Sequence, residues 1–343
     1  MGYTEIAMDY SAITGLTPEA EAFLAEWSNN CDYITAHTSG STGTPKQIRL
    51  LKKDMCASAR ATNIFFRISG RSTLSLPLSA DYIAGKMMIV RALIAGCRLI
   101  IEHPSLHPLS NHDAGERVDL TAIVPAQLSG LLENASLIPD LGAVIIGGAP
   151  LTESQERLIV DSGMNAYATY GMTETCSHVA LRRIGSDDCF TAMPDITFEI
   201  DCRGCLIINA PRFSFARLVT NDCVELLDTT HFRWLGRADN VINTGGIKVF
   251  AETLEKSLAP YAQAHIFFIS GRKSERWGEE IVMTVESDGT FDRERFMREA
   301  SESLERRLLP KEIIEISEIP RTSSGKIIRS SHNARGGSEN GTR

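Results

Sequence analysis

The chain has 343 residues, of which 43% are hydrophobic and 23% are charged, so it can bury a large core and form two or three structural units. Its formal net charge of −8 argues against nucleic acid or an anionic membrane as the main partner, since both favour a basic surface. The longest apolar run, Met87 to Ile101, is interrupted by Arg91 and Arg98 and is shorter than the roughly 18 residues that span a bilayer. The sequence therefore predicts no membrane span.

The first residues lack the basic and apolar regions of a secretory signal, which predicts a cytoplasmic protein. Eight cysteines are scattered, and only Cys202 and Cys205 have the C-x-x-C spacing. Residues 198–200 and 206–208 around them have the pattern of a hairpin that turns at Gly204. A second cysteine pair for zinc is absent, so reduced structural thiols are favoured over a redox or metal site.

An amphipathic helix is predicted near the start of the chain. Thr17, Pro18 and Glu19 have the character of a helix N-cap, a first-turn proline and an early acidic residue. Apolar residues then recur at the spacing of one helix face: Ala20, Phe23, Leu24 and Trp27.

Residues 37–46, HTSGSTGTPK, have the composition of a phosphate-binding loop. Glycines free the backbone, hydroxyl side chains and N–H groups can converge on an anion, and Lys46 adds positive charge. The loop is not the P-loop of nucleotide triphosphatases, because Pro45 stands where that motif needs glycine. Such a Ser/Thr/Gly run is also typical of a flexible linker.

Helical patterns then alternate with short apolar runs, which predicts crossover connections and a largely parallel α/β sheet. Ligands bind such sheets beyond the carboxyl ends of the strands. The expected helices and strands are 52–66, 73–76, 82–95, 98–101, 121–124, 143–146, 152–161 and 166–170.

Two of these strand ends have unusual residues. Gly147-Gly148-Ala149-Pro150 follows the run 143–146, and its missing side chains would let a flat ring lie against the backbone. Residues 170–175, YGMTET, combine an aromatic ring, hydroxyls and a carboxylate that can stack a base, contact a phosphate and hold a hard cation. Ordinary strand-to-helix and solvated turns are the alternatives.

From about residue 190 the pattern changes to alternating β, which predicts an antiparallel or barrel-like part with Thr220-Asn221-Asp222 at the end of a strand. Gly236 to Asn240 forms a polar joint, and the residues after it have a β/α pattern of their own. One expected helix there has a stripe of Phe296, Ala300, Leu304 and Leu308.

We therefore expect three parts. They are an N-terminal domain, 1–238, that is α/β to about 188 and β-rich over 189–238; a small α+β C-terminal domain, 239–329; and a polar, disordered tail, 330–343. The segment 320–329, PRTSSGKIIR, is a basic loop near the end of the second domain, and by itself such a loop is usually only solvated.

Five separated segments resemble, in order, motifs of the adenylate-forming superfamily of acyl-CoA synthetases, luciferases and peptide-synthetase adenylation domains. They are 38–46, 147–150, 170–174, 236–255 and 320–326. Within the family, residues 170–178 (YGMTETCSH) and 243–248 (NTGGIK) most resemble the o-succinylbenzoate–CoA ligases of menaquinone synthesis.

The chain departs from the family in three respects. One is that residues 77–86, PLSADYIAGK, replace the aromatic segment that often opens the acyl pocket. The phosphate loop begins about a hundred residues earlier than is typical, so we expect an N-terminal subdomain to be missing or reduced. We also expect a homodimer, because a second copy can complete the acyl pocket. The family usually has Gly-Asp where this chain has Asn221-Asp222, although the aspartate is retained.

The resemblance implies a role for each matching residue in binding ATP, Mg²⁺ and coenzyme A. Thr173 would contact the α-phosphate, Glu174 would hold Mg²⁺, and Lys326 would bridge the substrate carboxylate and the α-phosphate. Asp239 would be the hinge about which the C-terminal domain rotates between half-reactions, presenting Gly245-Gly246 to the pantetheine channel. The remaining expected nucleotide contacts are Ser39, Ser41, Thr42 and Lys46 for the phosphates, Gly147, Gly148, Ala149 and Tyr170 for adenine, and Asp222 and Arg237 for ribose, with Thr38, Gly40, Gly43 and Gly171 as further cofactor-binding residues.

The acyl pocket is the least defined part of the expected site. Tyr82, Lys86, Ser177 and His178 are its expected polar residues, and Arg91 is a further candidate. The implied function is an acid–thiol ligase for o-succinylbenzoate. The alternatives are a CoA ligase for another aryl or acyl carboxylate and a catalytically silent nucleotide-binding relative.

Overall fold

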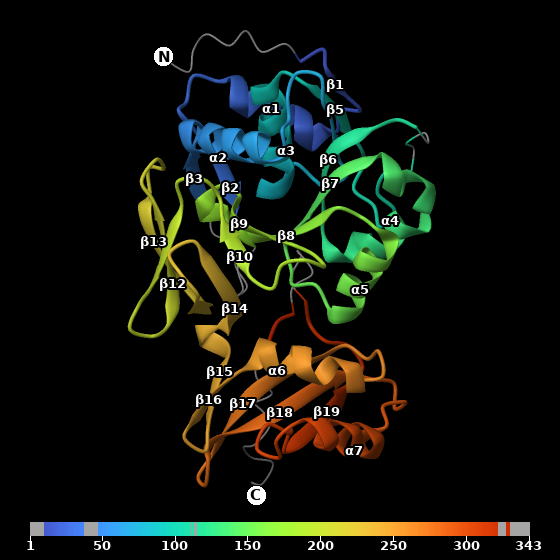
Figure 1. Cartoon of the computed structure of the whole chain (residues 1–343), viewed down its shortest axis with the longest axis vertical. Helices are drawn as coiled ribbons and strands as arrows, with labels where there is room; N and C mark the ends of the chain where they lie inside the picture. The colour runs from blue at the N-terminus through green and yellow to red at the C-terminus, as the bar shows by residue number, and fades with distance from the viewer. Residues whose placement is uncertain (1–9, 38–46, 111, 113–114, 322–326, 330–343) are drawn as a thin grey trace, which may run out of the picture.

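A computed structural model describes residues 10–37, 47–110, 112, 115–321 and 327–329. Within them, one sheet of twelve strands has the order β1-β5-β4-β6-β7-β8-β9-β10-β14-β13-β12-β11. A five-stranded sheet formed by β15–β19 lies below it in Figure 1. We call the part with β1–β14 the N-terminal unit and the part with β15–β19 the C-terminal unit.

The first half of the large sheet is parallel, as the alternating pattern predicts. Each of the neighbouring pairs from β1 through β5, β4, β6 and β7 to β8 is parallel. Its elements are β1 (Ile13–Thr14), α1 (Pro18–Ser28), α2 (Lys52–Phe65), β4 (Thr73–Leu76), α3 (Ile83–Ala95), β5 (Arg98–Ile101), β6 (Val118–Ile123), α4 (Leu128–Glu133), β7 (Leu141–Ile146), α5 (Glu153–Ser162) and β8 (Ala166–Gly171). The strands β2 (Tyr33–His37) and β3 (Gln47–Leu51) form a separate hairpin, and the loop 38–46 lies outside the described residues.

Helices cover both faces of this parallel part. Ala143 and Ile145 of β7 pack with the apolar faces of α1, α2 and α3, whereas Val144 and Ile146 pack with α4 and α5. Such alternation follows from the period of two along a strand. The helix predicted after Thr17 is confirmed as α1, and the Thr17 side chain accepts a hydrogen bond from the Ala20 amide at its start. The class α/β is therefore confirmed.

From β9 onward the large sheet is antiparallel. The elements are β9 (His178–Arg183), β10 (Phe190–Ala192), β11 (Thr197–Ile200), β12 (Cys205–Ala210), β13 (Ala216–Leu226) and β14 (His231–Arg237). They continue the parallel part through the β8–β9 pair, so they do not form a separate barrel. The predicted hairpin is confirmed in β11 and β12, with Gly204 at φ 82°.

One expected boundary in this region is wrong. Thr220-Asn221-Asp222 does not end a strand, because β13 continues unbroken through it to Leu226. The continuation lets Asp222 pair with Arg237 on β14, a contact between residues distant in sequence.

The C-terminal unit packs two helices against its sheet. Its elements are β15 (Val241–Thr244), β16 (Ile247–Phe250), α6 (Ala251–Leu258), β17 (Phe267–Ser274), β18 (Gly278–Glu286), α7 (Arg293–Ser303) and β19 (Glu312–Ile316). The predicted stripe is confirmed at Phe296 and Ala300, which are buried, but the helix ends at Ser303. Leu304 and Leu308 nevertheless pack against the same core.

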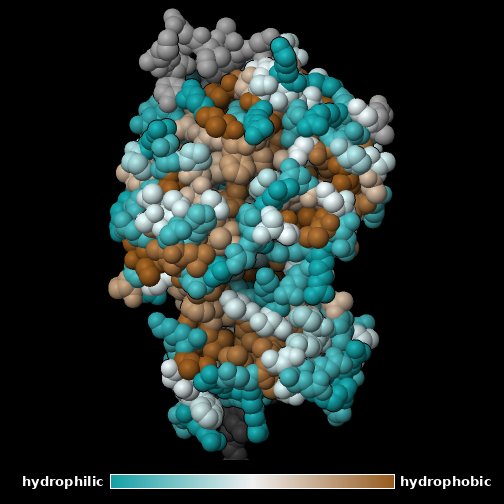
Figure 2. Space-filling model, viewed as in Figure 1, coloured by the Kyte–Doolittle hydropathy of each residue, from teal (hydrophilic) through white to brown (hydrophobic). Residues whose placement is uncertain are grey.

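The outline narrows between the two units in Figure 2, and most of the visible face is hydrophilic. The single turn Ala238–Asn240 connects the units along the chain. No helix in the described ranges is long and apolar enough to cross a membrane. The tail 330–343, predicted to be disordered, lies outside these ranges.

Candidate active site

The predicted adenine wall lies directly after β7. A Cβ at Gly147 would lie 2.4 Å from the Thr169 hydroxyl oxygen, so a side chain there would clash with β8. Gly148 has φ 86°, a left-handed conformation that favours glycine. Gly148 and Ala149 are exposed, so they leave a flat backbone surface open at the carboxyl edge of the parallel sheet. That surface fits the planar ring of a nucleotide base.

Tyr170, at the end of β8, joins this edge to the antiparallel part. Its ring meets Phe232 edge-to-face with centroids 5.0 Å apart, and its hydroxyl donates to Asp222 Oδ2 at 2.8 Å. Burial, followed by the charge of Asp222, raises the pKa of Tyr170 well above its usual value, so the phenol stays protonated and remains a donor. The aromatic ring is therefore held in a fixed orientation at the end of β8, the neighbour of the strand β7 that leads into the expected adenine wall.

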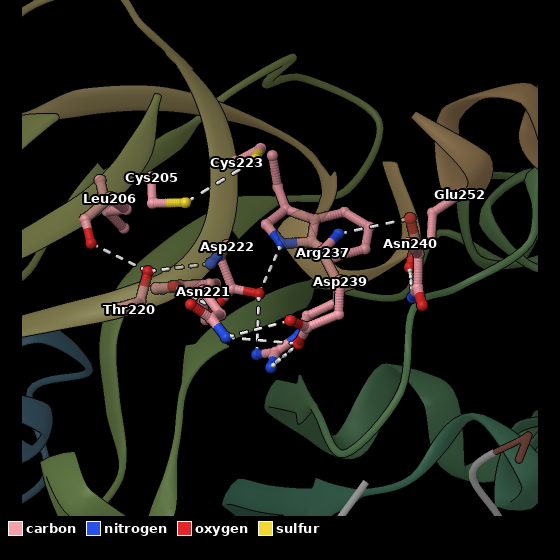
Figure 3. A network of polar contacts seen from close by, with 12 residues as sticks. Cys205, Leu206, Thr220, Asn221, Asp222, Cys223, Arg237, Asp239, Asn240 and Glu252 are labelled. Carbon is pink, nitrogen blue, oxygen red and sulfur yellow. Dashed lines mark hydrogen bonds and ion pairs between the residues drawn. The ribbon is translucent and has the colours of Figure 1, made fainter. Parts of the chain in front are cut away.

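Asp222 is the centre of the network in Figure 3. It is buried, and its Oδ1 lies 3.3 Å from the indole nitrogen of Trp234 and 3.4 Å from Nη1 of Arg237. The Arg237 side chain is 36% exposed, so one member of the pair is buried and the other is accessible to a ligand. A carboxylate of this kind can accept two hydrogen bonds from a ribose diol, and Arg237 is in place beside it.

The expected catalytic turn lies between β8 and β9. Thr173 is half-buried and Glu174 is exposed on the short 3-10 turn Thr173–Thr175. The Thr175 hydroxyl accepts from the Met172 amide at 3.0 Å and lies 2.7 Å from the Ser177 carbonyl oxygen, so it stabilises the turn. A Cβ at Gly171 would lie 2.2 Å from that same carbonyl, so glycine permits the tight approach of the two strands.

The acyl-pocket candidates have different surroundings. Tyr82 is exposed, whereas Lys86 is buried and donates to the Ala80 carbonyl at 2.8 Å while its ammonium lies 5.0 Å from the centre of the Phe23 ring. These contacts favour a role for Lys86 in packing α3 against α1.

A polar cluster from α2, α3 and the start of β9 instead contains the buried Thr62, Arg91 and His178 and the half-buried Ser177. Arg91 Nη2 donates to the Ser177 hydroxyl at 2.6 Å, and His178 Nε2 lies 3.2 Å from the Thr62 hydroxyl. Burial, followed by the nearby charge of Arg91, lowers the pKa of His178 well below its usual value, so this imidazole is neutral at pH 7. Thr62 was missed by sequence reasoning, because one threonine on an amphipathic helix carries no distinguishing signal.

The C-terminal unit contains the expected thiol channel residues and the base of the lysine loop. Gly245 and Gly246 turn between β15 and β16 with φ 57° and 82°, and the Gly245 amide donates to the Trp277 carbonyl at 2.9 Å. Lys326 lies outside the described residues, as do Thr38, Ser39, Gly40, Ser41, Thr42, Gly43 and Lys46. The chain on either side of residues 322–326 pairs at Arg321 and Ile327.

Arg329 fixes the far side of that loop. Its Nη2 lies 2.7 Å from Oε2 of Glu255 on α6, and its Nη1 donates to the Ile269 carbonyl at 3.0 Å. The base of the loop is therefore attached to the C-terminal unit.

The donor set suits a magnesium ion that is shared with phosphate. Among the described residues no three His, Cys, Asp or Glu side chains gather into a metal site. Mg²⁺ is commonly held by one or two carboxylates together with substrate phosphates, and the exposed Glu174 fits such a role.

The arrangement suits an adenine nucleotide at the carboxyl ends of a parallel sheet. Residues 24–210, more than half of the chain, match the AMP-binding enzyme family, and the chain belongs to that family. The adenylate-forming class predicted from the five motifs is thereby confirmed.

Relatives of the chain include AMP-forming acyl-CoA ligases. It is 22% identical to the 2-succinylbenzoate–CoA ligase of Listeria monocytogenes serotype 4b over 347 residues, covering 94% of this chain and 74% of that one. An acyl-CoA synthetase (AMP-forming)/AMP-acid ligase II-like protein from Dyadobacter fermentans is 31% identical, with a TM-score of 0.61, covering 92% of this chain and 93% of that one. The o-succinylbenzoate coenzyme A synthetase of Bacillus subtilis, solved with ATP and magnesium, has a TM-score of 0.74 at 19% identity, covering 86% of this chain and 68% of that one.

Proposed function

We propose that the protein is an ATP-dependent acid–thiol ligase that converts 2-succinylbenzoate to its CoA thioester by way of an acyl-adenylate. We choose a dicarboxylate as the substrate because Arg91 is a buried positive charge without an acidic partner in the described part of the chain. The names of the relatives point to the same substrate at low identity.

Arg91 is a buried cation without a protein counter-ion in the described part of the chain. It is 1% exposed, and among the described residues its Nη groups donate hydrogen bonds to Ser177 and the Met88 sulfur, while its Nε has no hydrogen-bond partner. Burial lowers the pKa of Arg91 to about 9, so the guanidinium is still protonated at pH 7. A buried unpaired charge is costly, and a substrate carboxylate would offset that cost.

Ser177 connects this cation to the expected acyl side of the site. It is half-buried, lies 2.6 Å from Arg91, and follows the turn that carries Thr173 and Glu174. A substrate with one carboxylate at that turn would direct a second one toward Ser177 and Arg91. 2-Succinylbenzoate has two carboxylates, whereas benzoate has only one.

In the first half-reaction an oxygen of the substrate carboxylate attacks the α-phosphorus of ATP, and the bond from that phosphorus to pyrophosphate breaks. Negative charge moves to the leaving group, so positioning and electrostatics dominate. We assign Ser39, Ser41, Thr42 and Lys46 to the β- and γ-phosphates, and Thr173 and Lys326 to the reacting α-phosphate. Magnesium held by Glu174 would neutralise charge on the departing pyrophosphate.

In the second half-reaction the sulfur of CoA attacks the acyl carbon, and AMP leaves with the carboxylate oxygen. We assign Gly245 and Gly246 to the channel for the pantetheine arm, since glycines let a thin chain pass close to the backbone. Rotation at Asp239 would withdraw Lys326 and bring this turn to the site.

A panel of acids tests the proposal. Pyrophosphate release and thioester formation are measured with 2-succinylbenzoate, benzoate and short aliphatic acids at equal concentrations. We expect both products with 2-succinylbenzoate and at least tenfold lower kcat/KM with benzoate. Release with benzoates alone would favour the other aryl-acid ligases, and no AMP with any acid would favour a silent nucleotide-binding relative.

We further propose that the enzyme acts in the cytoplasm, in menaquinone synthesis, as a homodimer. Sedimentation at assay concentration tests the homodimer, and an active monomer would contradict it.

A further inference from the structure

Asn221 stands where the related family usually has glycine, and its side chain has a defined role in this structure. Its amide nitrogen lies 3.3 Å from both carboxylate oxygens of Asp239, and its amide oxygen accepts a 3.0 Å hydrogen bond from Arg203. Arg203 is held in turn by an ion pair of 2.8 Å with Asp201. The two neighbours, a carboxylate and a guanidinium, fit only one orientation of the amide, with its donor toward Asp239. Figure 3 shows the contact between Asn221 and Asp239.

Asp239 receives a second contact from the ribose-site arginine. Arg237 Nη1 lies 3.4 Å from Asp222, and its Nη2 lies 3.3 Å from Asp239. Asn221 belongs to β13, before the turn Ala238–Asn240, whereas Asp239 is part of that turn. The side chain of Asn221 therefore connects the sheet of the N-terminal unit to the joint itself.

Two further polar contacts cross the joint. The Arg237 amide donates to Glu252 of α6 at 3.3 Å, and the Thr253 hydroxyl of α6 donates to the Leu235 carbonyl at 2.6 Å. Both contacts need α6 to lie against the end of β14. Rotation of the C-terminal unit about Asp239 would break them, so they are specific to this orientation.

The orientation is the one expected for the first half-reaction. In Figure 1 the chain leading to and from residues 322–326 leaves the C-terminal unit on the side that faces the N-terminal unit. The β15–β16 turn with Gly245 and Gly246 ends on the opposite side, away from the large sheet.

We propose that Asn221 is a positioning residue for adenylation. Its amide holds the Asp239 carboxylate and thereby holds the joint in the orientation in which α6 lies against the end of β14. The chemical consequence rests on the proposed function above, whereas the effect on the joint does not.

Three variants test the assignment. Asn221→Ala removes the amide, Asn221→Asp places a carboxylate against Asp239, and Asn221→Asp with Asp239→Asn exchanges the two groups and restores a hydrogen bond. Val219→Ala, an exposed position on the same strand, is the matched control. The first readout is hydrogen exchange of peptides from 235–255 in the free protein. The second is the rate of each half-reaction, with acyl-adenylate supplied for the thioester step.

In the single variants we expect faster amide hydrogen exchange over residues 235–255 together with slower adenylation. Adenylation should fall about threefold to tenfold in Asn221→Ala and further in Asn221→Asp, while thioester formation from supplied adenylate is retained. In the double variant, Asn221→Asp with Asp239→Asn, the adenylation rate should return to within about threefold of that of the unmodified enzyme. Val219→Ala should behave like the unmodified enzyme.

Unchanged hydrogen exchange over residues 235–255 in both single variants would overturn the proposal. An equal fall in the rates of both half-reactions would overturn it as well. A different outcome is faster hydrogen exchange in the single variants, reversed in the double variant, in a protein that adenylates no acid. That outcome would support the role of Asn221 at the joint and refute only the proposed ligase activity.

Discussion

At the scale of single residues, Arg91 carries the substrate proposal. Arg91→Met removes the charge but keeps much of the volume, so we expect KM for 2-succinylbenzoate to rise about 30-fold or more, as for loss of a buried charge pair. KM for benzoate should change less than threefold. Steady-state kinetics with both acids measure the difference.

Lys86→Met is the matched control, because Lys86 is also a buried cation on α3. Lys86→Met loses a hydrogen bond to Ala80 and a cation–π contact with Phe23, so we expect the free energy of unfolding to fall by about 1–2 kcal/mol. KM for the acid should be unchanged. An increased KM in Lys86→Met and none in Arg91→Met would contradict our assignment of the second carboxylate.

His178 predicts a pH dependence of stability. Its pKa is lowered in the folded state, so between that value and the unfolded value near 6.5 the unfolded chain binds more protons. The stabilisation is present above about pH 6.5 and is lost as the pH falls toward the folded pKa, at up to about 1.4 kcal/mol per pH unit. Urea unfolding between pH 5 and 7.5 should be less pH-dependent in His178→Gln than in the unmodified protein, and equal slopes would contradict this.

At the scale of elements, the β8–β9 turn depends on Gly171. A Cβ would lie 2.2 Å from the Ser177 carbonyl, so Gly171→Ala should separate the strands and displace Thr173 and Glu174. We expect kcat to fall about 100-fold or more, the size of effect seen when a transition-state contact is lost. Gly163→Ala at the end of α5 is the control, since it strains φ 73° without a clash there. Equal activity in the two variants would refute the role of the turn.

The elements themselves were largely predictable. Period-two and helical patterns located the parallel strands, and the residues after β7 and β8 indicated the ligand edge. The continuous β13 was not predicted, because Asn221 and Asp222 are turn-forming residues whose strand conformation depends on pairing with β14. The end of α7 was missed for a similar reason, since Leu304 keeps the apolar stripe but caps the helix in an extended conformation.

At the scale of the whole molecule, motif order predicted the family, but it could not predict which polar groups converge. Arg91 and Ser177 are 86 positions apart and meet only because the fold brings α3 next to the residue that precedes β9. Asn221 and Asp239 likewise meet only across the joint. Contacts of this kind arise from tertiary packing and have no local pattern.

The central claim is that a carboxylate is activated as an acyl-adenylate, and oxygen tracing tests it most directly. 2-Succinylbenzoate labelled with ¹⁸O in both carboxylates is converted with ATP, Mg²⁺ and CoA, and the AMP is analysed by mass spectrometry. Because the attacking oxygen stays on phosphorus when the thiol displaces AMP, we predict one ¹⁸O atom in each AMP formed. Thioester formation with unlabelled AMP, or with ADP as the nucleotide product, would contradict the account.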